Sequence, residues 1–264
     1  MSKYLAFAQS ALQTQLAYRG QVWAAWFGRL IQVFAWIAIW MAVYKDAGSV
    51  NGVTLPEMIT YAVIGSTLIT AWDWRKLIYT LGNSVTSGDV AIYLLKPLRF
   101  PLYLFATECG NLTYRIAAIA VPVIIVATLT YGVLPPASLF HGLMFLAFFA
   151  LSFVLMFLMA ALCGLLAFWL MTAFSLEWTL QGILSLLSGS AIPLWFFPDA
   201  AQGLIKLLPS AWIGYHPIAV YLGKTTVSET WFYFTLGLGW AGLMAGGVAL
   251  LWRAAATRIT VQGG

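Results

Sequence analysis

Residues 141–172 read HGLMFLAFFALSFVLMFLMAALCGLLAFWLMT, and no Asp, Glu, Lys or Arg interrupts them. A helix needs about 20 mostly apolar residues to cross the hydrocarbon core of a bilayer, so this stretch is long enough to span. The whole chain has the same character, since 62% of its 264 residues are hydrophobic and 8% are charged. Soluble domains carry about 25% charged residues. The composition therefore predicts an integral membrane protein and excludes an ordinary soluble fold.

Five further apolar stretches flank this one. They cover residues 21–44, 56–72, part of 102–133, 176–194 and 231–252. Together these stretches predict an all-α integral membrane protein with six transmembrane helices, folded as a single transmembrane domain over residues 1–264. Pro122 is expected to kink the third span, because proline removes a helix hydrogen bond.

Two segments are helical in pattern but unsuited to spanning. Residues 1–20 carry apolar side chains at helical spacing with glutamines on other faces, which predicts an amphipathic interfacial helix; the alternative is the start of a long first helix. Residues 190–228 contain short apolar pieces punctuated by prolines at positions 193, 198, 209 and 217. Broken helices at membrane depth need cover from protein or water, so we expect a re-entrant outer hairpin between the last two spans.

Basic residues are distributed unevenly between the two predicted sides of the membrane. With the N-terminus inside, three lie outside: Lys45, Lys206 and Lys224. Eight then lie on the cytoplasmic side: Lys3, Arg19, Arg75, Lys76, Lys96, Arg99, Arg253 and Arg258. Cytoplasmic loops collect Lys and Arg, so both termini are predicted to be cytoplasmic. Because the basic residues only flank the spans, they indicate contact with membrane lipids and no binding of nucleic acid.

The cytoplasmic region 73–101 contains the most informative motif, and residues 82–103 read GNSVTSGDVAIYLLKPLRFPLY. Ser87, Gly88 and Asp89 can cap a helix start, and Pro97 stops a helix after about two turns. The pattern predicts a short apolar helix lying beside the membrane. Taken alone, it could equally be an ordinary interfacial loop helix anchored by basic residues.

The stretch GDVAIYLLKPLRFPLY, residues 88–103, resembles the coupling loop of type-2 ABC exporter permeases, especially a bacterial subgroup with a G-D/E-x-x-x-x-L-L-K-P-L pattern. The proline-broken segment 188–217, which reads SGSAIPLWFFPDAAQGLIKLLPSAWIGYHP, resembles the outer re-entrant hairpin of that family. The resemblance implies a helix that docks on an ATPase subunit. Its residues would be Gly88, Asp89, Ile92, Leu94, Leu95, Lys96, Pro97 and Leu98.

The resemblance also implies partners and a location. The chain would be a permease subunit in the bacterial inner membrane, paired with a second permease, identical or paralogous. Two copies of a separate ABC ATPase subunit would bind ATP and magnesium and drive export of a hydrophobic or amphipathic substrate.

No ATPase is expected on the chain itself. Gly223, Lys224 and Thr225 match the end of a phosphate-binding P-loop, but Ile218 stands where its first glycine belongs. We therefore expect no catalytic residues, no metal site and no cofactor on this chain.

Several side chains within the spans are candidates for the transport pathway or its gating. Glu108 and Arg115 are seven residues apart and share a helix face, with Arg29 as a further member; the alternative is structural pairing near the cytoplasmic interface. Glu177 is a similar case. Pro193 and Phe197 are candidates from the outer hairpin, and tryptophans on spans one, two and five are expected to line a route for cargo. His141 and His216 lack metal-ligand spacing and are interpreted as interfacial polar residues.

Two other classes of function remain open at this point. A stand-alone secondary transporter or channel would be expected to show internal repeats, and a membrane enzyme or assembly factor would need a catalytic cluster. Few charges and many aromatic residues favour a hydrophobic or cationic small molecule as cargo.

Overall fold

The computed structural model describes residues 2–17, 20–86, 99–170 and 172–262, and helices make up most of them. In this part of the chain four helical stretches are long and apolar enough to cross a membrane. They coincide with four of the predicted spans. They are α2 (Gly20–Val43), the continuous run of α6 (Phe100–Arg115), η1 (Ile116–Ala120) and α7 (Val121–Tyr131), α8 (Leu139–Leu170), and α12 (Val227–Gln262).

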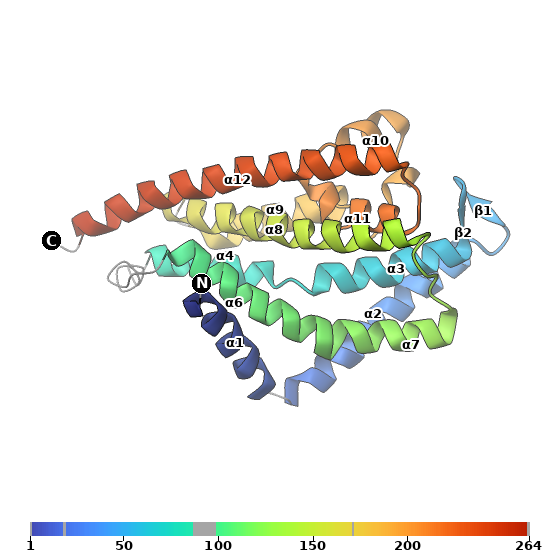
Figure 1. The fold of residues 1–264 in the computed structure, drawn as a ribbon, viewed down its shortest axis with the longest axis horizontal. Helices are drawn as coiled ribbons and strands as arrows, with labels where there is room; N and C mark the ends of the chain where they lie inside the picture. The colour runs from blue at the N-terminus through green and yellow to red at the C-terminus, as the bar shows by residue number, and fades with distance from the viewer. Residues whose placement is uncertain (1, 18–19, 87–98, 171, 263–264) are drawn as a thin grey trace.

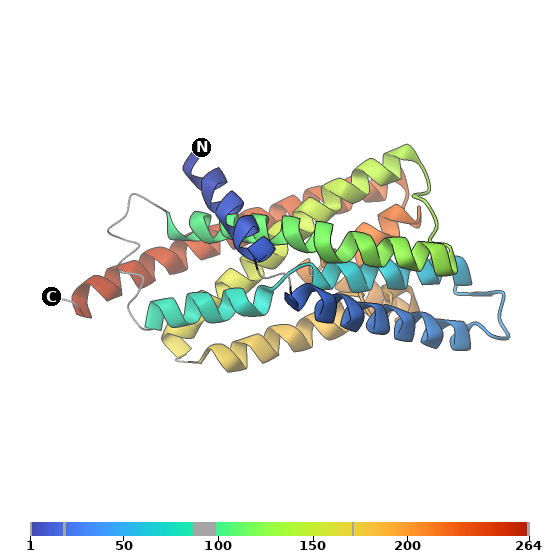
Figure 2. The ribbon, with the colours of Figure 1, turned by 90° about the horizontal axis from the view of Figure 1, so that it is seen from below.

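The two other predicted spans correspond to shorter helices. Helix α3 (Leu55–Thr70) has 16 residues and α9 (Ala173–Leu187) has 15. At 1.5 Å per residue they are about 24 and 22 Å long, less than the hydrocarbon thickness of about 30 Å. After a break at residues 71–73, the chain continues as α4 (Trp74–Thr86), so that α3 and α4 follow one another along the molecule (Figures 1 and 2). The count of six spans stays a prediction.

Helix α8 lies at the centre of the bundle and is the most buried of the four long stretches. It packs against α4, α12 and α11 (Tyr215–Tyr221). Close approach of α4 depends on small residues, because a Cβ added to Gly164 would lie 2.7 Å from the Cβ of Leu81. A Cβ on Gly82 would lie 3.2 Å from the Cβ of Ala167. The first half of the predicted cytoplasmic region is therefore a helix, α4, that packs closely on α8.

Helix α1 (Ser2–Ala17) crosses α6, as Figure 1 shows. Gly110 makes this crossing possible, because a side chain there would overlap the carbonyl group of Ala8. The Phe7 ring meets the edge of the Tyr103 ring at a centroid distance of 4.8 Å. The helix predicted for this segment is present and packs on α6, and its place in the membrane interface stays a prediction.

A short hairpin joins α2 to α3, where the sequence predicts only a polar turn. Strands β1 (Ser49–Val50) and β2 (Val53–Thr54) pair antiparallel. Between them Asn51 and Gly52 have φ angles of 51° and 73°. Asn-Gly is the preferred pair for such a turn because both central residues need positive φ.

The proline-broken segment folds into four short helices, each beginning close to a proline. They are η2 (Leu194–Phe196), α10 (Asp199–Ile205), η3 (Pro209–Trp212) and α11. Trp212, Ile218 and Ala219 are fully buried, so the segment is packed into the bundle. The interpretation of His216 as an interfacial residue is wrong. Its ring is fully buried, and its centroid lies 4.4 Å from the ring of Trp212 and 4.3 Å from that of Tyr233.

The third span passes Pro122 without ending. The five residues of η1 form a π-helical turn directly before α7, in which Pro122 is the second residue. A π-turn shifts the hydrogen-bond pattern by one residue. We attribute the continuity of the helix to this shift, which accommodates the missing N–H group of Pro122.

Candidate functional site

The predicted coupling residues Gly88, Asp89, Ile92, Leu94, Leu95, Lys96, Pro97 and Leu98 all lie outside the described residues. The helices on either side of them are described. Helix α4 ends at Thr86 and α6 begins at Phe100, and both of these helix ends lie toward the end of the molecule opposite the β hairpin (Figure 1). Along the chain, segment 87–98 is connected to the bundle through α4 and α6.

Helices α3 and α4 are separated by a break at Ala71, Trp72 and Asp73, and Arg115 of α6 holds it. One guanidinium nitrogen of Arg115 lies 3.2 Å from a carboxylate oxygen of Asp73, and the other donates to the carbonyl oxygen of Ala71 at 3.4 Å. The second contact satisfies a backbone carbonyl that the end of a helix leaves without a partner. Glu108 lies 3.9 Å from the same guanidinium.

Glu108 and Arg115 are thus brought together, because they lie two turns apart on the same face of α6. Both side chains are 14% exposed. Glu108 also accepts a hydrogen bond of 2.9 Å from Asn111, whose carbonyl oxygen accepts one of 3.3 Å from Gln15. This polar network connects the break, α6 and α1.

A second ion pair holds the start of α4 from the opposite side. Arg75 lies 3.1 Å from the carboxylate of Glu177 on α9, and it donates a hydrogen bond of 2.6 Å to the side-chain oxygen of Gln181. The Glu177 side chain is only 7% exposed, and a buried carboxylate needs a partner of this kind. The sequence singled out Glu177 but not its partner, because 102 positions separate Arg75 from it.

Arg29 does not join the Arg115 network. It donates a hydrogen bond of 2.6 Å to the side-chain oxygen of Gln32, one turn along α2. No ion pair in the described part of the chain involves Arg29.

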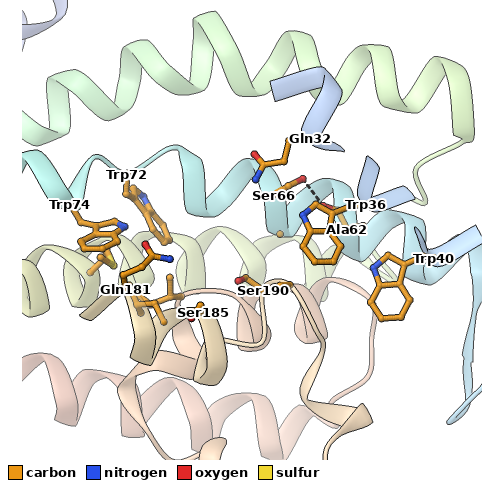
Figure 3. A pocket seen from close by; sticks show the side chains of 15 residues that line it. Gln32, Trp36, Trp40, Ala62, Ser66, Trp72, Trp74, Gln181, Ser185 and Ser190 are labelled. Carbon is orange, nitrogen blue, oxygen red and sulfur yellow. Dashed lines mark hydrogen bonds between the residues drawn. The ribbon is translucent and has the colours of Figure 1, made fainter. Parts of the chain in front are cut away.

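A pocket of about 180 Å³ lies between α2, α3, α8, α9 and the start of the proline-broken segment. Figure 3 shows Trp72 and Trp74 at one end of it and Trp36 and Trp40 at the other. Polar residues occupy the walls between the two pairs of tryptophans. They are Gln32, Ser66, Gln181, Ser185 and Ser190.

Neither Pro193 nor Phe197 lines this pocket. The segment reaches it instead through Ser190 and Ala191, just before Pro193. Pro193 is buried and Phe197 half-buried, so both contribute to packing.

The break and the pocket meet at Trp72, which belongs to the break and lines the pocket. Asp73 faces Arg115, whereas its chain neighbours Trp72 and Trp74 line the pocket. Gln181 lines the pocket and holds Arg75. A shift of α4 would therefore move two tryptophans in the pocket wall.

The hairpin end of the molecule is held by a third ion pair. Lys224 lies 2.8 Å from Glu57 at the start of α3 and donates to the carbonyl oxygen of Gly52 at 3.1 Å. Asn51 donates to the carbonyl oxygen of Trp195 at 3.0 Å. The lysine of the incomplete P-loop pattern is thus engaged in a structural contact.

Comparison with known proteins yields one family. The family model described as "ABC-2 family transporter protein" matches residues 30–263. No curated protein and no solved structure matches the chain.

Proposed function

Since the chain belongs to the ABC-2 family of transporter proteins, we propose that it is the membrane-spanning permease subunit of an ATP-driven exporter. In this proposal the chain crosses the bacterial inner membrane six times with both termini in the cytoplasm, and it pairs with a second permease. Two copies of a separate ABC ATPase subunit bind ATP and magnesium and supply the energy.

The tryptophan-lined pocket is the part of the chain best suited to receive a hydrophobic or amphipathic substrate. Ligand sites are concave and mostly apolar, with a few placed polar groups, and this pocket combines four indole rings with glutamine and serine side chains. Its tryptophans come from α2, from the break after α3 and from the start of α4, and Trp178 of α9 does not line it.

The connection between the pocket and segment 87–98 is the single observation that carries the proposal. This segment joins the end of α4 to the start of α6, and α4 begins at the Asp73 break that α6 holds through Arg115. The break places Trp72 and Trp74 in the pocket wall. A push on the coupling residues can therefore change the shape of the pocket without any contact between ATPase and substrate.

Alternating access follows from this connection. ATP binding favours one arrangement of the ATPase subunits, and a ligand shifts an equilibrium only through its different affinity for the two states. The Asp73 break is the element that would adopt two arrangements. Substrate would leave toward the end that carries the β hairpin.

Replacing Leu94 and Leu95 by glutamate tests the coupling assignment. An apolar docking surface that acquires two charges must desolvate them to bind, so we expect loss of ATP hydrolysis stimulated by the permease in the purified complex. The matched control replaces both residues by isoleucine, which keeps the apolar surface. Unchanged stimulation in the glutamate variant, with normal membrane insertion, would show that these residues do not couple the two subunits.

A further inference from the structure

The hydrogen-bonding groups of the tryptophan-lined pocket show which molecules it accepts, and Gln32 is the first of them. An arginine can only donate hydrogen bonds, so the Gln32 atom that lies 2.6 Å from Arg29 must be its carbonyl oxygen. The amide nitrogen of Gln32 is therefore the group left for a ligand. Gln32 is exposed and lines the pocket.

Gln181 repeats this arrangement on the opposite wall. Its carbonyl oxygen accepts a hydrogen bond of 2.6 Å from Arg75, and by the same reasoning its amide nitrogen remains. Two glutamines on different helices are thus both turned so that they present donors (Figure 3).

The indoles of Trp40 and Trp72 add no donors to the pocket. Trp40 is 7% and Trp72 6% exposed, and the Nε1 atoms of both are buried without a hydrogen-bond partner among the described residues. An acceptor must come within about 3 Å of a donor, and a nitrogen without exposed surface leaves no room for one. These two rings therefore offer a ligand only apolar surface.

Acceptors for a ligand's own donors are few. Ser66 already donates to the carbonyl oxygen of Ala62 at 2.6 Å, and Ser185 to that of Gly182 at 3.0 Å. The lone pairs of these hydroxyl groups and of Ser190 remain, beside the two amide donors of Gln32 and Gln181.

The charges around the pocket disfavour cations. Indole faces attract cations, but no Asp or Glu lines this pocket. The guanidinium groups of Arg29 and Arg75 each lie 2.6 Å from a glutamine in its wall. Glu177 offsets the charge of Arg75, and Arg29 has no carboxylate partner in the described part of the chain. Of the two cargo classes expected from the sequence, hydrophobic and cationic, these charges favour the hydrophobic one.

We propose that the pocket binds an uncharged, flat apolar molecule through carbonyl or ether oxygens, which accept from the amide nitrogens of Gln32 and Gln181. The inference rests on the proposed function only in taking this molecule to be the exported substrate. The ring faces of Trp36 and Trp74 would cover its apolar body.

Three probes of similar shape test this selectivity. Anthraquinone is uncharged and has two carbonyl acceptors, anthracene has none, and 9-aminoacridine is a cation at neutral pH. Their affinities are measured for the full chain in lipid nanodiscs, with binding to empty nanodiscs subtracted. We expect anthraquinone to bind about tenfold more tightly than either other probe. Absence of anthraquinone binding, or equal affinity for anthracene or 9-aminoacridine, would overturn the proposal.

Substitutions then locate the donors. Replacing Gln32 and Gln181 by methionine keeps side chains of similar length and removes both amide groups, so anthraquinone should bind about tenfold more weakly while anthracene binding is unchanged. Gln9→Met is the matched control, because Gln9 is exposed on α1 and lies outside the pocket. An unchanged affinity of Q32M/Q181M for anthraquinone would contradict the proposal.

These measurements need no ATPase, so the two proposals can fail separately. Selective anthraquinone binding by a chain that captures no ATPase subunit would contradict the exporter function alone. An ATPase-coupled chain that binds the three probes equally would contradict the acceptor selectivity alone.

Discussion

At the scale of single residues, Arg115 is the side chain that connects three groups around the break. It contacts Asp73, the Ala71 carbonyl group and Glu108, and it is 14% exposed. One guanidinium thus satisfies a helix end and two carboxylates near the predicted cytoplasmic interface. Loss of its charge would leave Glu108 with Asn111 as its remaining hydrogen-bond partner among the described residues.

We expect Arg115→Gln to lower the free energy of unfolding by about 1–2 kcal/mol, a value reduced because Asp73 is partly exposed to solvent. Thermal unfolding of the purified chain in detergent measures this change. Arg253→Gln is the control, since Arg253 is exposed on α12 and makes no ion pair in the described structure. Equal unfolding midpoints for the two variants would contradict the role of Arg115.

The residue pairs of the site differ in how far the sequence predicts them. Glu108 and Arg115 share a helix face, and Arg29 and Gln32 are three residues apart, so helical spacing is a sufficient signal for both pairs. Arg75 and Gln181 are 106 residues apart, and only packing of α4 against α9 brings them together. The orientation of Gln181 therefore depends on tertiary structure, whereas that of Gln32 is set within one turn of α2.

At the scale of secondary structure, the break is the point where α3, a predicted span, ends and α4, the helix that leads to segment 87–98, begins. Residues 71–73 read AWD, and Asp73 marks the start of α4 locally, because it accepts a hydrogen bond of 3.4 Å from the backbone N–H of Lys76. The contact that stabilises the break comes from Arg115, 42 positions further on. By contrast, Asn51–Gly52 marks the hairpin locally, and the prolines mark the short helices of the segment 190–228.

Helix α4 can transmit movement only if it stays packed on α8. Alanine at position 164 would place its Cβ 2.7 Å from that of Leu81 and 3.2 Å from the Ile78 carbonyl oxygen. Overpacking costs about 1–3 kcal/mol, which exceeds the gain of about 1 kcal/mol that alanine brings to a helix. We expect Gly164→Ala to lower the thermal unfolding midpoint and the ATP hydrolysis stimulated by the permease.

The control for this variant is Gly28→Ala on α2. A Cβ at Gly28 meets no atom within 4 Å, so this substitution should leave the unfolding midpoint unchanged or slightly raised. A midpoint for Gly164→Ala at or above that of Gly28→Ala would show that the contact between α4 and α8 is not tight.

At the scale of the whole molecule, the two ends of the bundle are built from different elements. The ends of α4 and α12 lie at one end, and the β hairpin lies at the other (Figure 1). Helix α12 has 36 residues and is about 54 Å long, so it extends beyond a hydrocarbon core of about 30 Å. A Cβ added at Gly242 or Gly246 would meet no atom of the described residues within 4 Å, so this small-residue face of α12 is left open in the bundle.

Apolar stretches and basic-residue asymmetry are properties of the chain that need no tertiary structure, which is why the membrane class and the four long helices follow from the sequence. The bounds of α3 lie within two residues of the predicted span 56–72, whereas α9 ends at Leu187, before the predicted end at residue 194. Helix α9 ends next to Gly189, whose φ is 71°, and the Ser188 carbonyl accepts from Tyr215 at 2.9 Å. This last contact joins distant parts of the chain.

The central claim is that this chain works with a separate ATPase, and co-purification tests it most directly. The tagged chain is purified from the membranes of its own host, and its companions are identified and quantified. The account predicts a P-loop ATPase subunit at a one-to-one ratio with the permease, lost in the Leu94→Glu/Leu95→Glu variant. A chain that purifies without an ATPase and still transports would contradict the account and identify a stand-alone transporter.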